Sequence, residues 1–172
     1  MKYFVLSFLL WLMVPVYADD SYQDIQGYDK TDWNMSVDEV KRAEHPKVVE
    51  VSPPEVFKTG VALLAINEIE IASNKFKVLF LFDEASGKLS QVNIKGYESK
   101  NAGINALVFS SLEKLLTEKY GTPSYKNDGR EVSWKLSKTT IVLSHLNIPR
   151  VISQVTVMYK PISATDSASS SL

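Results

Sequence analysis

The stretch Lys75–Phe82 (KFKVLFLF), followed by Asp83–Gly87 (DEASG) and Lys88–Tyr97 (KLSQVNIKGY), decides the fold. In the first run, large apolar side chains occupy every second position, at Phe76, Val78, Phe80 and Phe82. This is the period of a strand that buries one face. The middle segment is rich in turn-forming residues and ends in a glycine that suits a positive φ. The stretch therefore predicts a β-hairpin.

More strands are predicted on both sides of this hairpin. Before it, Gly60–Ala72 is rich in β-branched and aliphatic residues and ends at a tight turn, Ser73–Asn74. A short strand at Glu55–Lys58 follows Pro53 and Pro54. After the hairpin, three segments have the same character: Arg130–Leu136, Thr139–Leu146 and Val151–Lys160.

Two helices are predicted, one before the first group of strands and one between the two groups. The first, Val37–Glu44, begins with a capping box in which Ser36 and Glu39 exchange hydrogen bonds, and it ends before Pro46. The second ends at Gly121 and carries an apolar stripe with a period of about 3.6 residues. The stripe consists of Ile104, Leu107, Val108, Leu112, Leu115, Leu116 and Tyr120.

These elements predict an α+β fold in which two helices pack on one face of an antiparallel sheet of about six strands. Each helix is followed by a proline and about three strands, so the order suggests a duplicated αβββ unit. The predicted core draws on both groups of strands and on the second helix. It consists of Phe76, Val78, Phe80, Phe82, Leu107, Leu112, Leu116, Trp134, Ile141, Leu143, Val155 and Val157.

The first eighteen residues have the pattern of a secretory signal peptide. Lys2 precedes an apolar run that is shorter than the ~20 residues a membrane-spanning helix needs, and the run ends in an A-x-A-like site at Ala18. We predict cleavage after Ala18 (residues 1–18), export to the periplasm, and no membrane anchor thereafter. Beyond it we expect a loose leader at residues 19–31, a single domain at residues 32–162 and a disordered tail at residues 163–172.

Composition excludes several classes of protein. The chain has 172 residues and no cysteine, which excludes a disulfide scaffold, a cysteine zinc site, an iron–sulfur protein, a thiol enzyme and a lipid-anchored lipoprotein. The formal charge of −1 argues against a nucleic-acid partner, because proteins that bind nucleic acid carry a basic surface. An exported domain without cysteine depends on its core alone for stability.

Two short motifs carry a resemblance to small exported bacterial proteins. Trp33–Val40 (WNMSVDEV) resembles a W-G-M-S/T-x-x-E-V opening, and Leu115–Pro123 (LLTEKYGTP) resembles an L-x-x-K-Y-G-x-P helix end. The resemblance implies a family of periplasmic, often lipoprotein-like domains of unknown function. More distantly, it implies the α/β shape of β-lactamase-inhibitor-like proteins and of SmpA/OmlA outer-membrane assembly lipoproteins. Asn34 departs from the family's glycine, and the lipidated cysteine is missing.

Residues suited to catalysis are few. His45 precedes a proline at the end of a helix, and His145 lies in a strand, so both are interpreted as structural. Neither forms a transition-metal spacing pattern. Three carboxylate pairs are interpreted in the same way, as a solvated strand face, a hairpin loop and a helix start: Glu68 with Glu70, Asp83 with Glu84, and Asp38 with Glu39. We therefore expect no enzyme activity, no catalytic residue, no cofactor and no metal.

The favoured function is a non-catalytic periplasmic binding or protein-interaction module. Its partner would be another envelope protein or a small ligand, and its interaction surface would use the aromatic residues Trp33, Tyr97, Tyr125 and Trp134. One alternative is an inhibitor of an exported hydrolase, which would expose aromatic side chains on the open sheet face or at hairpin tips. The other is a carboxylate-dependent hydrolase, which needs two acids that converge in a pocket.

Overall fold

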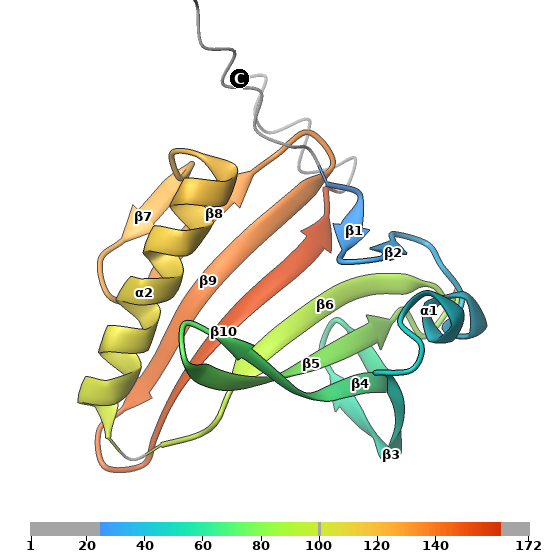
Figure 1. The fold of residues 1–172 in the computed structure, drawn as a ribbon, viewed down its shortest axis with the longest axis horizontal. Coiled ribbons are helices and arrows are strands. Elements are labelled where there is room, and N and C mark those ends of the chain that lie inside the picture. The colour runs from blue at the N-terminus through green and yellow to red at the C-terminus, as the bar shows by residue number, and fades with distance from the viewer. Residues whose placement is uncertain (1–24, 100, 163–172) are drawn as a thin grey trace, which may run out of the picture.

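A large antiparallel sheet dominates the computed structural model, which describes residues 25–99 and 101–162 (Figure 1). Its eight strands are β3 (Val49–Phe57), β4 (Gly60–Ile71), β5 (Asn74–Phe82), β6 (Leu89–Gly96), β7 (Tyr125–Asn127), β8 (Glu131–Lys135), β9 (Thr139–Ile148) and β10 (Ile152–Pro161). A separate hairpin pairs β1 (Gly27–Tyr28) with β2 (Thr31–Asp32). The helices are α1 (Val37–Ala43) and α2 (Ala102–Tyr120).

The sheet consists of two four-stranded meanders that meet at their last strands. Its order is β3-β4-β5-β6-β10-β9-β8-β7, and the junction is the antiparallel pair of β6 with β10, in which Ile94 lies opposite Val157. The predicted hairpin at β5 and β6 is confirmed. In its loop, Asp83 Oδ1 accepts hydrogen bonds from the Ser86 N–H at 2.8 Å and from Ser86 Oγ at 2.7 Å, and Gly87 has φ +64°.

The predicted α+β fold, with two helices as one layer on a sheet of about six strands, is wrong. The described chain is mostly β, with an eight-stranded sheet and a two-stranded one. The two helices do not form a layer: α1 packs on β4, whereas α2 packs on β9 and β10 in the other half of the sheet. The predicted αβββ order fails as well, because each helix is followed by four strands.

Two strands lengthen the sheet beyond the prediction, each for a local reason. β3 runs through Pro53 and Pro54, which are tolerated because this is an edge strand, and its register shifts between Glu50 and Glu55. β7 has only three residues, too few to show a period in the sequence. The predicted signal peptide, the first part of the leader (residues 19–24) and the predicted tail lie outside the described residues.

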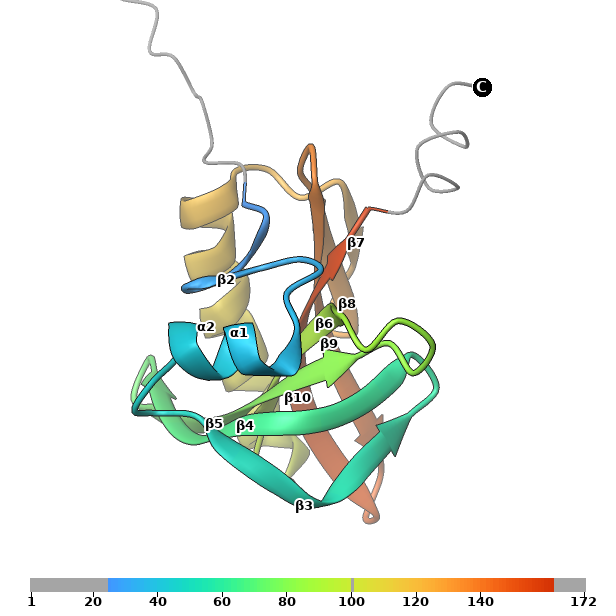
Figure 2. The same ribbon diagram turned by 90° about the vertical axis from the view of Figure 1, so that its right-hand side faces the viewer.

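One face of the sheet forms the main core together with both helices (Figures 1 and 2). Residues from β5, β6, β8, β9, β10 and α2 meet there, and α1 contributes Val40. A smaller cluster lies on the opposite face and consists of Ala62, Ala65, Leu79 and Leu81. Central strand β5 is therefore buried on both faces. Among the described residues, no helix combines the length and apolar character needed to span a membrane.

The helices differ in how well the sequence predicted them. The capping box of α1 is confirmed: the Glu39 N–H donates to Ser36 Oγ, and Glu39 Oε2 accepts from the Ser36 N–H at 2.7 Å. In α2 the buried face is rotated toward Asn105 and Phe109, which sequence reasoning left out. Leu107, predicted as core, is 72% exposed because it lies on the side of the stripe that faces away from the sheet.

Candidate ligand-binding cavity

The β1–β2 hairpin lies between α1 and the C-terminal end of α2 (Figures 1 and 2). Its turn is tight: Thr31 Oγ1 donates to the Tyr28 carbonyl at 2.7 Å. Gly27 is required here, since a Cβ at this position would lie 1.7 Å from the Thr31 carbonyl oxygen. From residue 25 onward, the segment predicted as a loose leader is thus a packed part of the fold.

Side-chain hydrogen bonds fasten this hairpin on two sides. Trp33 Nε1 donates to Thr139 Oγ1 at 2.9 Å, and Thr139 Oγ1 in turn donates to the Ile25 carbonyl. Thr139 is fully buried at the start of β9, so this bond ties the hairpin to the second half of the sheet. On the other side, the Lys30 N–H donates to Glu44 Oε1 at 3.2 Å, just after α1.

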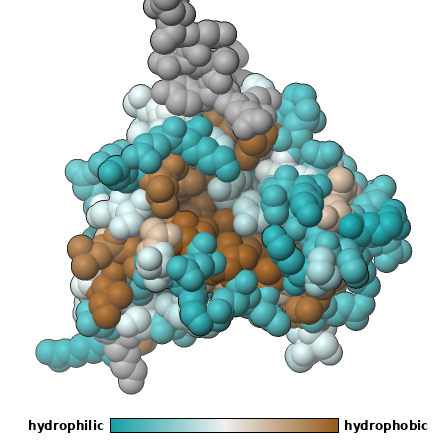
Figure 3. All heavy atoms as spheres, viewed as in Figure 1, coloured by the Kyte–Doolittle hydropathy of each residue, from teal (hydrophilic) through white to brown (hydrophobic). Residues whose placement is uncertain are grey.

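A cavity of about 400 Å³ lies beneath the hairpin. Its lining combines the hairpin with the end of α2 and with β10: Ile25, Gln26, Gly27, Tyr28, Asp29, Thr31, Asp32, Lys119, Tyr120 and Tyr159. We call it the tyrosine cavity. Figure 3 shows the face on which this hairpin lies, with apolar side chains gathered in its middle and extending to the left, where α2 lies. A volume of this size is typical of small-ligand sites.

Three tyrosine rings from distant parts of the chain meet in the cavity. The Tyr28 and Tyr159 ring centroids are 5.4 Å apart and edge-on, and those of Tyr120 and Tyr159 are 6.5 Å apart. Tyr28 also packs edge-on against Phe80 of the sheet, at 6.3 Å. Such edge-to-face contacts fix the rings in place.

The hydroxyls of Tyr28 and Tyr159 keep their protons at neutral pH. Burial, reinforced by Asp29, Glu44 and Tyr120, raises the pKa of Tyr28 to about 12. Burial and the neighbouring tyrosines also raise the pKa of Tyr159 well above its usual value. These hydroxyls can therefore donate as well as accept hydrogen bonds, but they are poor bases.

Charged groups at the cavity have a negative excess. Asp29 and Asp32 contribute two carboxylates, whereas Lys119 contributes one ammonium group. That ammonium lies 5.1 Å from the centroid of the Tyr120 ring, a cation–π geometry. The cavity therefore already holds one cation against a tyrosine face.

A buried carboxylate stands behind the hairpin. Glu44 is 1% exposed, and in the described part of the chain its Oε2 has no hydrogen-bond partner. Burial raises the pKa of Glu44, although the Lys30 N–H opposes this shift. The α1 end is thus held by a group that is costly to keep ionised.

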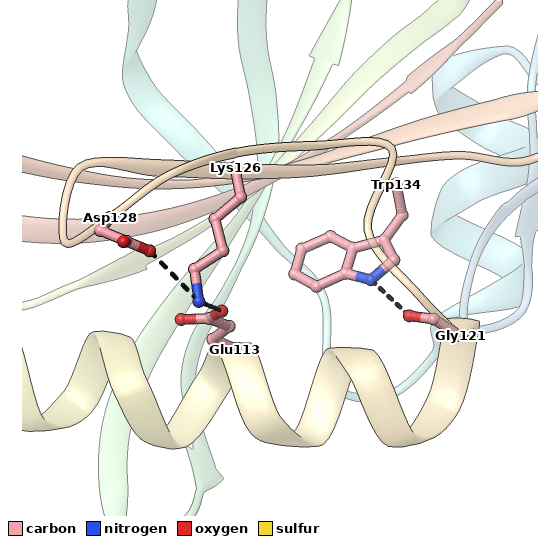
Figure 4. Close-up of polar contacts among 5 residues, drawn as sticks. All are labelled: Glu113, Gly121, Lys126, Asp128 and Trp134. Carbon is pink, nitrogen blue, oxygen red and sulfur yellow. Dashed lines mark hydrogen bonds and ion pairs between the residues drawn. The ribbon is translucent and has the colours of Figure 1, made fainter.

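The four aromatic residues predicted as an interaction surface lie in four different surroundings. Trp33 anchors the hairpin, as described above. Trp134 is 1% exposed and donates through Nε1 to the Gly121 carbonyl at 2.9 Å, which ties β8 to the end of α2 (Figure 4). Tyr97 is 57% exposed and lines a cavity of about 210 Å³ beside α2, and Tyr125 is 51% exposed in β7.

A second hollow, of about 710 Å³, lies between the first turns of α2, the β7–β8 turn and β9. We call it the β9 cleft; it is lined by Ala102, Gly103, Ala106, Asp128, Gly129, Arg130, His145, Leu146 and Asn147. Next to the cleft residue Asp128, Lys126 bridges Glu113 at 2.6 Å and Asp128 at 3.3 Å (Figure 4). The ion pairs fix the β7–β8 turn against α2.

Behind this cleft, an imidazole meets a hydroxyl. His145 Nε2 is 2.9 Å from Ser153 Oγ, which also accepts from Asn105 Nδ2 at 3.1 Å. A serine beside a histidine is the first pair of a nucleophilic site. Ser153 is only 1% exposed, however, so a substrate cannot reach its oxygen in this arrangement. The pair is best understood as a polar link between α2, β9 and β10.

The three predicted carboxylate pairs have structural surroundings. Glu68 forms an ion pair with Lys75 at 3.0 Å, Asp83 holds its hairpin loop, and Glu39 belongs to the helix cap. The acids that line the tyrosine cavity, Asp29 and Asp32, were missed because Asp29 falls in the predicted leader and Asp32 is the first residue of the predicted domain. Their signal in the sequence is faint: a Gly-Tyr and a Thr-Asp pair on either side of an Asp-Lys turn.

In residues 25–99 and 101–162, no three His, Cys, Asp or Glu side chains lie close enough together to hold a metal ion. The chain matches no protein-family model, no curated protein and no solved structure.

Proposed function

We propose that this protein is a non-catalytic binding module, exported to the periplasm, whose tyrosine cavity takes a small ligand with an ammonium or guanidinium group. Export rests on the N-terminal sequence pattern alone. The cavity carries the rest of the proposal: three tyrosine rings and two aspartates against one lysine, in a volume suited to a small ligand.

A cationic ligand fits the cavity for two reasons. Aromatic faces attract cations through their quadrupole, and Lys119 over the Tyr120 ring is an example within the chain. Asp29 and Asp32 leave a negative charge that Lys119 does not balance. The protonated hydroxyls of Tyr28 and Tyr159 offer donors to any polar group that accompanies the cation.

Catalysis has less support. The hydroxyls of Tyr28 and Tyr159 keep their protons near neutral pH, and only a deprotonated tyrosine can act as a general base. Ser153 is buried, and a general base in the cavity would have to be an exposed aspartate. The arrangement is that of a recognition site.

Isothermal titration calorimetry tests the proposal. The probes are choline and agmatine, each compared with a neutral analogue; for choline, a tert-butyl group replaces the trimethylammonium group. We expect the cations to bind at least about tenfold more tightly than the neutral analogues, a difference of about 1.4 kcal/mol. Equal binding of both, or binding of neither, would contradict the proposal.

Two variants localise the binding. Gly27→Ala places a Cβ against the Thr31 carbonyl and should open the hairpin, so that choline binding is lost. Gly129→Ala is the control, because a Cβ at Gly129 meets nothing within 4 Å and its positive φ, which Gly27 lacks, confines any strain to the β7–β8 turn. If Gly27→Ala bound choline as well as Gly129→Ala does, the site would lie elsewhere.

A further inference from the structure

The outer edge of β9 is covered by β8 over only part of its length. The last β8 pair joins Glu131 to Ser144, and the His145 N–H donates to the Arg130 carbonyl at 2.8 Å. β9 continues to Ile148, beyond the end of β8. Leu146 and Ile148 are 50% and 47% exposed there.

The backbone groups of Asn147 point toward this open edge. Asn147 lies opposite Ser153 of β10, but the Ser153 N–H and carbonyl are both bonded to Ser99 on its other side. Asn147 and Ser153 are therefore a non-hydrogen-bonded pair, in which the Asn147 N–H and carbonyl face away from β10. They face the same side as the His145 N–H, toward the line that β8 would follow if it were longer.

Other edges of the sheet are protected, and this one is not. β3 carries Pro53 and Pro54, and β7 is only three residues long. Prolines and short strands prevent an edge from pairing with another chain. The segment from Leu146 to Ile148 has neither proline nor charge before its turn.

The β9 cleft provides room beside this edge. Its wall on α2 consists of small residues, Ala102, Gly103 and Ala106. Of its two charged residues, Asp128 pairs with Lys126 at 3.3 Å, whereas Arg130 has no ion-pair partner among the described residues. An incoming segment with a carboxylate would complement this arginine.

We propose that the edge of β9 from His145 to Ile148 receives an extended, acidic segment of a partner protein, which pairs with the Asn147 backbone as an added strand. Such β-strand addition supplies backbone hydrogen bonds for affinity, and side-chain contacts supply selectivity. The segment would continue the line of β8, with its carboxylate at Arg130. This site is separate from the tyrosine cavity and does not depend on it.

Amide chemical shifts in an NMR titration test this proposal on the full chain. The probes are capped peptides of alternating valine and glutamate, or of valine and lysine. We expect the glutamate peptide to shift the Asn147 amide at lower concentration than the lysine peptide does. Shifts confined to other regions, or equal affinity for both peptides, would overturn the proposal.

Asn147→Pro and Asn147→Ala form a matched pair of variants. Proline removes the outward N–H without breaking a bond to β10, whereas alanine removes only the side chain. The proline variant should bind the glutamate peptide about tenfold or more weakly than the alanine variant, since one backbone hydrogen bond is lost. Equal affinity of the two would refute strand addition.

Sedimentation without peptide tests whether a second copy of this chain, rather than a partner segment, occupies the edge of β9. If the wild-type chain is a dimer that Asn147→Pro converts to a monomer, the edge belongs to a second copy, and the proposal of a partner segment is overturned. A monomer in both cases supports it. Choline binding should be unchanged in Asn147→Pro. The proposal of strand addition and the proposal of a cation site in the tyrosine cavity can therefore be refuted separately.

Discussion

The two halves of the sheet have the same order of elements but are covered in different ways. In the second half, α2 has nineteen residues and covers β9 and β10. In the first half, α1 has only seven residues and packs on β4. The β1–β2 hairpin completes the cover at the border between the halves.

This difference shows where a binding site can arise. The long helix leaves the β9 cleft beside its first turns, and its last turn contributes Lys119 and Tyr120 to the tyrosine cavity. The two-stranded hairpin meets the end of α2 and strand β10, and the tyrosine cavity lies between them. The border at which α2 ends and the β1–β2 hairpin takes over is thus the source of the candidate site.

Truncation of α2 should have the largest effect, because this helix packs on both β9 and β10 of the second half. Phe109→Ala removes a ring that is 2% exposed and should cost about 3–5 kcal/mol in the free energy of unfolding. Leu107→Ala, on the exposed side of the same helix, should change it by no more than about 0.5 kcal/mol. Urea denaturation measures both values, and similar losses would show that the helix does not cover its half as described.

Alkaline pH should lower the stability of the fold through Tyr28 of the β1–β2 hairpin. Since the pKa of Tyr28 is raised to about 12 in the fold, an unfolded tyrosine releases its proton first, near pH 10. Stability is therefore fully present below pH ~10 and is lost as the pH rises to about 12, by up to ~3 kcal/mol. Tyr28→Phe should show a smaller alkaline loss in thermal unfolding, and an identical pH profile would count against the burial of Tyr28.

Neutralising Glu44 should strengthen the first half. Burial raises the folded pKa of this carboxyl, so its ionisation lowers stability as the pH rises above the usual glutamate value. Glu44→Gln keeps an acceptor for the Lys30 N–H and should add about 1–3 kcal/mol at pH 7. The gain should vanish near pH 4; a gain that persists in acid would point to a cause other than the charge.

Breaking the ion pair beside α2 should have the smallest effect. Lys126 reaches Glu113 and Asp128 at the surface (Figure 4), so Lys126→Ala should lower stability slightly, and the loss should disappear at high salt. A loss that salt does not reduce would mean that packing of the lysine stem, not its charge, fixes the β7–β8 turn.

The long strands could be predicted because their residues alternate over enough positions. β5 shows this best, with Phe76, Val78 and Phe80 in the core. The helix cap at Ser36 could also be predicted, since a capping box involves only neighbouring residues. Local patterns of this kind do not depend on the rest of the chain.

Features that depend on distant partners could not be predicted. The two-residue strands β1 and β2 have no period, and contacts with distant residues, among them Thr139, Glu44 and Tyr159, make them part of the fold. The face that α2 buries was predicted slightly out of rotation, because Asn105 is drawn inward by Ser153, forty-eight residues away. The tyrosine cavity combines three such distant segments, the β1–β2 hairpin, the end of α2 and β10, so no single stretch of sequence predicted it.

An NMR titration of the full chain with choline and with its neutral tert-butyl analogue tests the central claim most directly. The claim is that the border between the end of α2 and the β1–β2 hairpin leaves a site for a cation. It predicts that choline shifts the amides of Gly27, Tyr28, Lys119 and Tyr120, while the neutral analogue at the same concentration does not. Shifts of these amides with both compounds, or with neither, would contradict it.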